Sequence, residues 1–354
     1  MDRDSPRGAR RRPHRSSSFF ARDSRIAYHR AVDALSDALR VLRLTGAIFL
    51  DAEFTAPWCT ISRSGRPVTH PLPPGGNVIF FHFLTEGCCS VRLAKGGEML
   101  EVRAGDVVLL PRDDDHMLGS DLTLTPVDSA TIIRPADASG LMRIGYGGGG
   151  ERTRFGCGYT ICDERLSRPL LDALPRIVRV PMGEGPATAW IRSLMQTGAA
   201  ETAMSRPGSE TVRAKLSELL FVEVLRRYME LLPEGRTGWL AGLRDDHIGR
   251  ALGHLHQQPG HDWTVDELAA KVGLSRSALA QRFTDLVGQP PMQYLTRWRI
   301  TIAAQRLRTE RASLARIAGD LGYDSEAAFN RAFKRELGST PAAWRRGDRV
   351  SPDG

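Results

Sequence analysis

The chain has 354 residues, of which 41% are hydrophobic and 25% are charged. This is the composition of a globular protein with a core of good size, and it excludes wholesale disorder. No stretch approaches about 18 consecutive apolar residues, which excludes a membrane-spanning helix. The five cysteines are an odd number in a long chain, which argues against a secreted disulfide framework and for a reducing cytoplasm.

The formal net charge of +8 is unevenly distributed along the chain. Residues 1–30 carry nine Arg and three Asp, whereas residues 31–246 carry 24 basic and 27 acidic residues. Residues 247–346 again have an excess of six positive charges, from 15 basic and nine acidic residues. A compact basic block with helical patterning points to nucleic acid more specifically than a basic tail does.

The first 30 residues are predicted to be a disordered basic tail. The arginine run at 10–12 is not followed by an apolar region, because Arg22, Asp23 and Arg25 interrupt at once, so a signal peptide is not expected. The tail either has no role or adds weak, salt-sensitive attraction to DNA.

The middle of the chain changes from a helical to a strand-like pattern. Residues 33–44 suit a short amphipathic helix. The runs at 78–81, 89–93 and 107–110 are short, β-prone and separated by Gly- and Pro-containing segments, which predicts a small sandwich or barrel. We expect residues 147–150, four consecutive glycines, to form a flexible break, and a strand to restart at 155–161.

A helical period returns between residues 186 and 232. One apolar stripe contains Trp190, Leu194 and Met195, and a second runs from Leu216 to Tyr228 and includes Leu219, Leu220, Val224 and Leu225. The second stripe is interpreted as core packed against the strands, with a dimer face as the alternative. Residues 233–242 are expected to be a short linker.

The C-terminal block contains an internal repeat, which is the strongest signal in the sequence. The pattern LAxxVG at 268–273 recurs as IAxxLG at 317–322, and LxxxFxxxxG at 279–288 recurs as FxxxFxxxxG at 329–338. Each unit reads as a short helix, a turn with a glycine and a second helix, which is a helix-turn-helix. A further helix from 291 to about 307 joins the two units.

The second helix of each unit has an inward and an outward face. Thr264 and Glu267 form a capping box before the first helix of the first unit, and Ser275 and Ser325 cap the second helices. Phe283, Phe329 and Phe333 point inward as core. The outward residues are polar, small or basic, as suits a helix lying in the major groove: Arg276, Ser277, Ala280, Gln281, Arg282 and Thr284 in the first unit, and Glu326, Ala327, Asn330, Arg331 and Lys334 in the second.

Gln, Asn and Arg are the side chains that can pair bidentately with base edges. Ala280 and Ala327 can touch thymine methyl groups but cannot read bases by hydrogen bonding. On the connecting helix and at its end, some of the arginines are expected to meet phosphates and the rest to be solvated: Arg297, Arg299, Arg306 and Arg308.

The tandem units closely resemble the DNA-binding domain of the AraC/XylS family of transcription regulators over about residues 247–346. The motifs that carry the resemblance are PMQYLxxWR at 291–299, GYxSxxxFxRAFK at 322–334 and GxxPxxWR at 338–345. The resemblance implies that the connecting helix holds both reading helices on one face of DNA, in successive major grooves about 34 Å apart. It favours base contacts by Ser277, Gln281, Asn330 and Arg331.

Residues 33–180 resemble the cupin-type sensor domain of AraC-like regulators. The matching segments are HFLTEG at 82–87, GDVVLLPRDDDH at 105–116, FGCG at 155–158 and LLDALP at 170–175. The resemblance implies a double-stranded β-barrel related to the jelly roll. The metal-binding cupins that this segment resembles carry an HxH motif with a following Glu and a later His, but here Phe80 stands at the first His position.

The residues that could serve the sensor are therefore His82, Glu86 and His116, with Cys88, Cys89 and Cys157. Two His and a Glu could bind a transition metal, but because the set is incomplete we expect ligand-contact or structural roles and no metal. Some related sensors respond to oxidants through cysteines, although a buried Cys is commonly a small hydrophobe. Cys88 and Cys89 should point to opposite faces of a strand, while Cys157 and Cys162 could approach each other around a strand end.

The sequence predicts an α+β multidomain protein with an N-terminal cupin-like β-barrel, a helical bridge and a C-terminal all-α double helix-turn-helix domain. The expected boundaries are a tail at 1–30, the sensor at 31–180, the bridge at 181–242, the DNA-binding domain at 243–346 and a C-terminal tail at 347–354.

The predicted function is a cytoplasmic, non-enzymatic transcription regulator that senses a small molecule or redox signal. The expected partners are double-stranded DNA, an unknown effector and RNA polymerase, with a homodimer left open; no membrane, cofactor, metal or catalytic residue is expected. The alternatives are a cupin-fold metalloenzyme with an appended DNA-binding domain, and an architectural DNA binder without a ligand.

Overall fold

The structure is a computed structural model that describes residues 33–42, 44–64, 76–135, 142–183, 186–204, 206–233 and 235–347. The predicted basic tail at 1–30 and most of the C-terminal tail lie outside these ranges. No described helix is long and apolar enough to cross a membrane.

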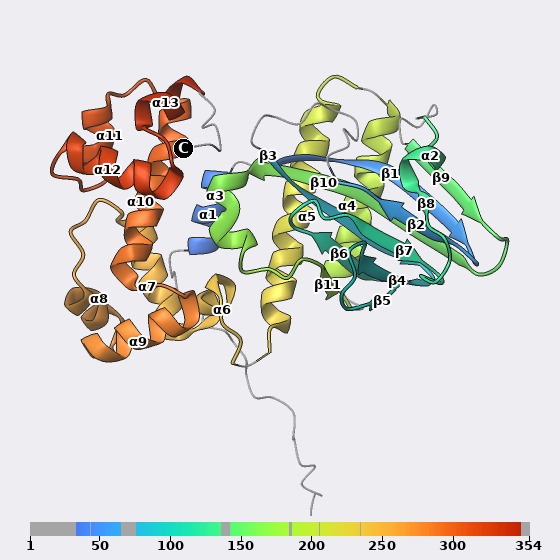
Figure 1. The fold of residues 1–354 in the computed structure, drawn as a ribbon, viewed down its shortest axis with the longest axis horizontal. Helices are drawn as coiled ribbons and strands as arrows, with labels where there is room; N and C mark the ends of the chain where they lie inside the picture. Colours follow the sequence, from blue (N-terminus) through green and yellow to red (C-terminus); the bar gives the residue numbers. More distant parts are fainter. Residues whose placement is uncertain are drawn as a thin grey trace, which may run out of the picture. The chain divides into compact units, whose positions relative to one another are not determined.

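Two open sheets make up the N-terminal part of the fold (Figure 1). The six-stranded sheet has the order β11-β6-β3-β10-β1-β9 and the five-stranded sheet the order β5-β4-β7-β2-β8. The described strands thus form two separate sheets, and the single closed barrel implied by the resemblance is not seen. Their bounds are β1 Thr45–Thr55, β2 Cys59–Ser62, β3 Gly76–Glu86, β4 Cys88–Leu93, β5 Leu100–Arg103, β6 Asp106–Leu110, β7 His116–Gly119, β8 Val127–Asp128, β9 Met142–Gly147, β10 Arg152–Asp163 and β11 Val178–Pro181.

The alternation of side chains along β3 divides the core into two layers. Ile79, Phe81 and Phe83 point to the face that the helices cover, while Val78 and Leu84 join the cluster that includes residues of both sheets. The six-stranded sheet is therefore buried on both faces, which explains why β3 reads as a nearly continuous apolar run.

The long helices α4 (Pro186–Met204) and α5 (Ser209–Leu231) pack against this sheet (Figure 1). Leu220, Phe221 and Val224 are fully buried, which confirms the interpretation of the second stripe as core. The stripes were predicted too wide, however, because Trp190 is 40% exposed and Leu219 is 45% exposed. Leu219 precedes Leu220, so a turn of about 100° carries it away from the packed face.

Residues 147–150 form an ordered turn, contrary to the expected flexible break. The amide of Gly148 donates to the Thr55 carbonyl at 2.8 Å and that of Gly149 to Thr55 Oγ1 at 2.9 Å. Gly147 has a φ of 141°, and a Cβ there would lie 1.9 Å from the Thr55 carbonyl oxygen. The glycines therefore let the β9–β10 connection lie directly on the end of β1.

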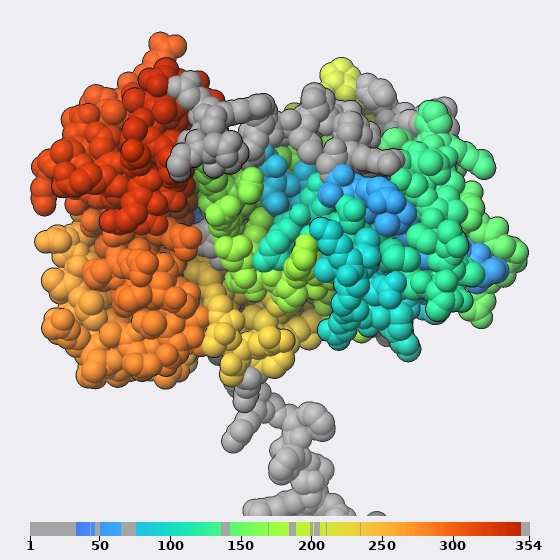
Figure 2. Space-filling view, in the orientation of Figure 1, coloured from blue at the N-terminus to red at the C-terminus, as the bar shows by residue number. Residues whose placement is uncertain are grey.

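The C-terminal part is entirely helical and forms a continuous packed body in the space-filling view, coloured orange to red (Figure 2). Two helix-turn-helix units, α8–α9 and α11–α12, are joined by α10. The remaining helix bounds are α1 Ala34–Leu42, α2 Ser129–Ile132, α3 Glu164–Leu171, α6 Trp239–Arg244, α7 Asp246–Gln257, α8 Val265–Val272, α9 Arg276–Val287, α10 Pro291–Thr309, α11 Leu314–Asp320, α12 Glu326–Leu337 and α13 Pro341–Arg346.

The predicted helix caps are present, with one difference. The hydroxyls of Thr264, Ser275 and Ser325 each accept a hydrogen bond from a backbone amide in the first turn of the following helix. Glu267, however, binds His261 Nε2 at 3.0 Å, so its carboxylate is engaged outside the expected capping box.

The linker predicted at 233–242 is shorter than expected. Helix α6 begins at Trp239, and Trp239 and Leu240 are buried. Trp239 Nε1 donates to the Tyr294 hydroxyl on α10 at 2.8 Å. The second half of this segment is thus part of the core around α10, because a tryptophan there finds both an apolar site and a hydrogen-bond acceptor.

Candidate nucleic-acid interface

Helix α9 presents the residues predicted to read DNA from the first unit. Leu279 and Phe283 are fully buried and fix one face of the helix in the core. Ser277 and Gln281 are exposed on the other side, and Ala280 and Thr284 are half-buried. This is the inward and outward division expected from spacings of three and four residues.

Several polar groups of this first unit already have partners within the protein. Gln281 Nε2 donates to Asp285 Oδ1 at 2.8 Å, and Thr284 Oγ1 donates to the Ala280 carbonyl at 2.7 Å. Arg276 lies 3.4 Å from Asp266 in an exposed pair. Such contacts between exposed groups are weak, so Arg276 and Gln281 can exchange them for groups of DNA.

The outward residues of helix α12 make fewer hydrogen bonds and ion pairs with other described residues of the protein than those of α9 do. Phe329 and Phe333 are fully buried, while Glu326, Ala327, Arg331 and Lys334 are exposed and Asn330 is half-buried. Within the part of the chain that the structure describes, no hydrogen bond or ion pair occupies the guanidinium of Arg331 or the amine of Lys334. Both cationic groups are therefore free to contact DNA.

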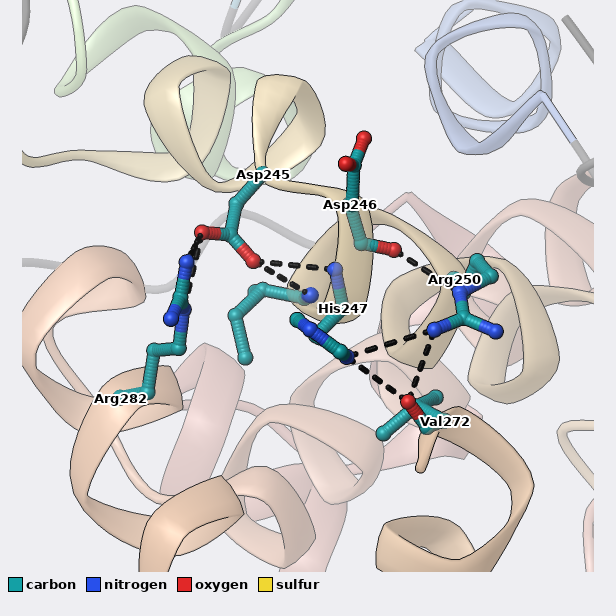
Figure 3. Close-up of polar contacts among 7 residues, drawn as sticks. Asp245, Asp246, His247, Arg250, Val272 and Arg282 are labelled. Carbon is teal, nitrogen blue, oxygen red and sulfur yellow. Dashed lines mark hydrogen bonds and ion pairs between the residues drawn. The ribbon is translucent and has the colours of Figure 1, made fainter. Parts of the chain in front are cut away.

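Asp245 connects the start of α7 to the middle of α9 (Figure 3). One oxygen, Oδ1, accepts from the amides of His247 and Ile248 at 3.1 and 2.9 Å, which caps α7. The other, Oδ2, accepts from Arg282 Nε at 2.9 Å. Burial raises the pKa of Asp245, but the hydrogen bonds and charge of Arg282 and the two amides outweigh this and lower the pKa below its ordinary value.

The carbonyl at the end of α8 is also held by α7 (Figure 3). The Val272 oxygen accepts from His247 Nδ1 and from Arg250 Nη2, each at 2.8 Å. A terminal carbonyl has no partner inside its own helix, so these donors fix α8 relative to α7. Sequence reasoning missed this arrangement; the only available signal was the Asp-Asp-His run at 245–247, which resembles an ordinary helix start.

Three of the four arginines of α10 bind other parts of the protein. Arg299 donates to the carbonyls of Pro259 and His261 at 2.6 and 2.8 Å. Arg306 binds Glu310 and Asp320, and Arg308 binds Asp163 and lies 4.3 Å from the Trp344 ring centroid. These side chains are neither simply solvated nor free for phosphates.

The sensor residues His82, His116 and Cys157 lie together in the core between the sheets. His82 Nε2 is 3.0 Å from His116 Nε2, and His82 Nδ1 is 3.0 Å from Cys157 Sγ. Burial lowers the pKa of His82 to about 3 and also lowers that of His116, so both rings are neutral at pH 7.

Neutral rings fix the direction of each hydrogen bond in this cluster. His116 Nδ1 lies 2.9 Å from the Asp114 carbonyl, which can only accept, so this nitrogen carries the proton. His116 Nε2 then accepts from His82 Nε2, and His82 Nδ1 accepts from the Cys157 thiol. Each hydrogen bond in this linear series, from Cys157 to the Asp114 carbonyl, thus has one donor and one acceptor. Burial also raises the pKa of the Cys157 thiol.

Glu86 does not join these histidines. It is exposed at the end of β3, four residues and about 13 Å along the strand from His82. Among the described residues, no group of three or more His, Cys, Asp or Glu side chains could hold a metal ion.

The other cysteines are separated by the strand geometry. Cys88 is exposed and Cys89 is buried, which confirms the expected opposite orientation. Cys157 and Cys162 do not approach each other, contrary to expectation: they point to opposite faces of β10 and lie in different core clusters. All five cysteines are free thiols.

Comparisons with known proteins agree with both parts of this architecture. A cupin family model matches residues 33–230, and a helix-turn-helix domain model matches residues 268–347. A Streptomyces antibioticus protein described as an AraC-like transcription regulator is 38% identical over 316 residues, 89% of this chain and 99% of the relative.

The RCS-specific HTH-type transcriptional activator RclR of Escherichia coli K12 is 28% identical over 318 residues, 89% of this chain and 97% of that protein. A solved structure of the DNA-binding domain of AdpA in complex with a target DNA is 32% identical. It covers 31% of this chain and all of that chain, with a TM-score of 0.29.

Proposed function

The chain belongs to the AraC-type DNA-binding transcription regulators with a cupin-like N-terminal domain, and from this premise we propose how it reads DNA. Helices α9 and α12 lie in successive major grooves on one face of the duplex, held by α10. The observation that carries the proposal is the free, exposed cationic and polar face of α12, opposite the fully buried Phe329 and Phe333.

The two reading helices contribute differently in this proposal. Arg331 and Asn330 read bases from α12, because both side chains can pair bidentately with base edges. Lys334 and Arg276 contact phosphates, while Ser277 and Gln281 read bases from α9. Ala280 and Ala327 contact thymine methyl groups, and Thr284 and Glu326 border the contact surface.

Arg282 has a different role in the proposed complex. Its guanidinium is bound to Asp245, so it orients α9 from within the protein. Moving it to DNA would leave the Asp245 carboxylate, which is largely buried, without its cationic partner.

The N-terminal part acts as the sensor in this proposal, and the chain carries out no catalysis. A small molecule or a redox signal received there changes DNA binding in the cytoplasm, and the DNA-bound protein contacts RNA polymerase, alone or as a homodimer. The cluster of His82, His116 and Cys157 supports a signal-receiving site because it joins two imidazoles and a thiol by hydrogen bonds inside the fold.

The full chain provides the test. A binding site is selected from random duplexes, and its affinity is compared with that of a scrambled duplex by fluorescence anisotropy at several salt concentrations. We expect the selected site to bind about 10³-fold or more tightly than the scrambled duplex, and affinity for both to fall steeply with salt. Equal affinity for the two duplexes would contradict the proposal.

A further inference from the structure

We propose that a cavity beside α10 binds a small organic anion, with a carboxylate facing the guanidinium of Arg297 and an apolar group directed toward Trp298. The cavity lies against helix α3 of the cupin-like part and helices α10 and α12 of the DNA-binding part. The assignment deepens the sensing role proposed above and rests on it.

Two adjoining hollows form this site. The larger has a volume of about 310 Å³ and is lined by Arg165 and Arg168 of α3, by Arg297 of α10 and by the end of α12. The smaller, of about 30 Å³, lies among Leu166, Leu170 and the aromatic residues around Trp298. Both are lined by Arg297 and Thr301, so they meet at one turn of α10. The site thus has a roomy polar end and a narrow apolar end.

The polar end carries an uncompensated positive charge. Arg165 donates to the Leu337 carbonyl at 3.0 Å, and Arg168 lies 3.7 Å from Glu164. Glu336, the acidic residue of the lining, is bound to Arg335 at 3.1 Å. Arg297 is half-buried, and across the described ranges its guanidinium has neither a hydrogen bond nor an ion pair. A half-buried cation without a partner favours an anionic ligand.

Two hydrogen-bond donors among the residues that line the apolar end also lack partners. Tyr294 accepts from Trp239 Nε1 at 2.8 Å, so its own hydroxyl donates to His256 Nε2 at 2.6 Å. Because burial lowers the pKa of His256 to about 3, the ring is neutral and its proton lies on Nδ1. His256 Nδ1 and Trp298 Nε1 are both buried without an acceptor.

These observations select the chemical class of the ligand. Every unpaired group at the site is a donor: the guanidinium of Arg297, the Nδ1–H of His256 and the Nε1–H of Trp298. A carboxylate only accepts hydrogen bonds and matches a guanidinium in charge and geometry. The imidazole of His256 stacks on Trp298 at 3.9 Å between ring centroids, so the apolar group of a ligand held in the larger hollow faces aromatic and aliphatic walls on the side of the smaller one.

The position of the site gives the ligand a means of regulation. Its walls come from α3, which follows β10 of the six-stranded sheet, and from α10, which joins the two reading units. A ligand that binds more tightly to one arrangement of these helices shifts the population toward that arrangement. The ratio of the ligand's affinities for the two arrangements sets the upper limit of the resulting change in DNA affinity.

The test uses phenylacetate as the probe and phenylacetamide as its neutral control, with the full chain. Binding is followed by isothermal calorimetry and by fluorescence of the tryptophans. We expect phenylacetate to bind about tenfold or more tightly than the amide, and Arg297→Gln to weaken phenylacetate binding by about tenfold, ~1.4 kcal/mol. Arg297→Lys should restore part of the affinity, and Arg192→Gln, an exposed arginine on α4, should leave it unchanged.

Three results would overturn the assignment: no phenylacetate binding to the wild-type chain at about 5 mM, equal affinity for the amide, or unchanged binding by a folded Arg297→Gln variant. DNA affinity is measured separately without the probe. If the wild-type chain binds phenylacetate but no specific DNA site, the proposed function is contradicted. If it binds a specific DNA site but not phenylacetate, only the anion site is contradicted.

Discussion

Asp245 and Arg282 are 37 residues apart, yet the carboxylate of Asp245 both caps α7 and holds the guanidinium of Arg282 on α9. The carboxylate is 13% exposed, whereas the Arg282 side chain is 51% exposed. One residue outside the helix-turn-helix unit therefore fixes the orientation of the first reading helix.

Replacing Asp245 separates its two roles. Asp245→Asn keeps an oxygen that can cap α7 but loses the charge, and should cost about 0.5–1 kcal/mol because Arg282 is half exposed. Asp245→Ala also removes the cap and should cost about 1–2 kcal/mol more. Urea unfolding measures both, with Asp266→Ala, in the exposed pair with Arg276, as the control expected to change stability least. Equal losses for the Asn and Ala variants would show that the cap contributes nothing.

Stability should fall as the solution is acidified from pH 6.5. Burial lowers the pKa of His82 and of His256 to about 3 and also lowers that of His116. In the unfolded chain these rings bind protons near pH 6.5, so their contribution to stability is complete above this value and is lost as the pH falls below it. For His82 and His256 the loss continues toward about pH 3. Each histidine adds up to about 1.4 kcal/mol per pH unit to the slope of the free energy of unfolding against pH.

Urea unfolding at pH 7.5, 6.5 and 5.5 measures this slope before most carboxylates titrate. His256→Phe retains an aromatic ring against Trp298 and should remove one histidine's share of the slope. A free energy of unfolding that stays constant from pH 7.5 to 5.5 would show that the three rings accept protons freely in the folded protein.

Thiol reactivity should distinguish Cys88 from the other cysteines. Cys88 is exposed, whereas Cys59, Cys89, Cys157 and Cys162 are buried. Burial raises the pKa of Cys89 to about 12 and that of Cys162 to about 11, and a thiol reacts as its thiolate. A chromogenic disulfide reagent should therefore label one thiol rapidly in the native chain and all five in denaturant.

The variant Cys88→Ser should abolish the rapid phase of labelling, while Cys89→Ser should leave it unchanged. If Cys157 also reacts rapidly, the hydrogen-bonded chain through His82 and His116 opens on the time scale of labelling.

The sequence reveals contacts that are set by local spacing. Phe329 and Phe333 are four residues apart on one helix, so their common inward face follows from the helical period, and the structure buries both. Cys88 and Cys89 are adjacent on a strand, so their opposite orientation follows in the same way.

Contacts between distant segments could not be predicted in this way. The chain from Cys157 through His82 to His116 depends on the pairing of β10 with β3 and on the packing of the two sheets, neither of which leaves a local pattern. The unpaired donors near Arg297 likewise depend on how α3 packs against α10. The expectation for Cys157 and Cys162 was wrong because β10 continues through both residues as one strand, which places them on opposite faces.

The last prediction separates base reading from helix positioning in α12. Arg331 is exposed and unpaired among the described residues, so Arg331→Ala should leave the free energy of unfolding nearly unchanged. If Arg331 forks onto O6 and N7 of a guanine, the variant should lose about 1–3 kcal/mol of binding and relax preference at one base pair.

Phe333→Ala provides the contrasting case, because the ring is fully buried and packs edge-on against Phe329 and Trp344. Its removal leaves a cavity that should cost about 3–5 kcal/mol of stability and weaken binding to every sequence. Site selection with wild type and each variant, together with urea unfolding, distinguishes the two effects. If Arg331→Ala instead leaves the selection profile unchanged, with uniformly weaker binding and a smaller salt dependence, Arg331 contacts a phosphate. A variant that lacks one phosphate contact releases one counterion fewer from the DNA, without any change in the sequence that is read.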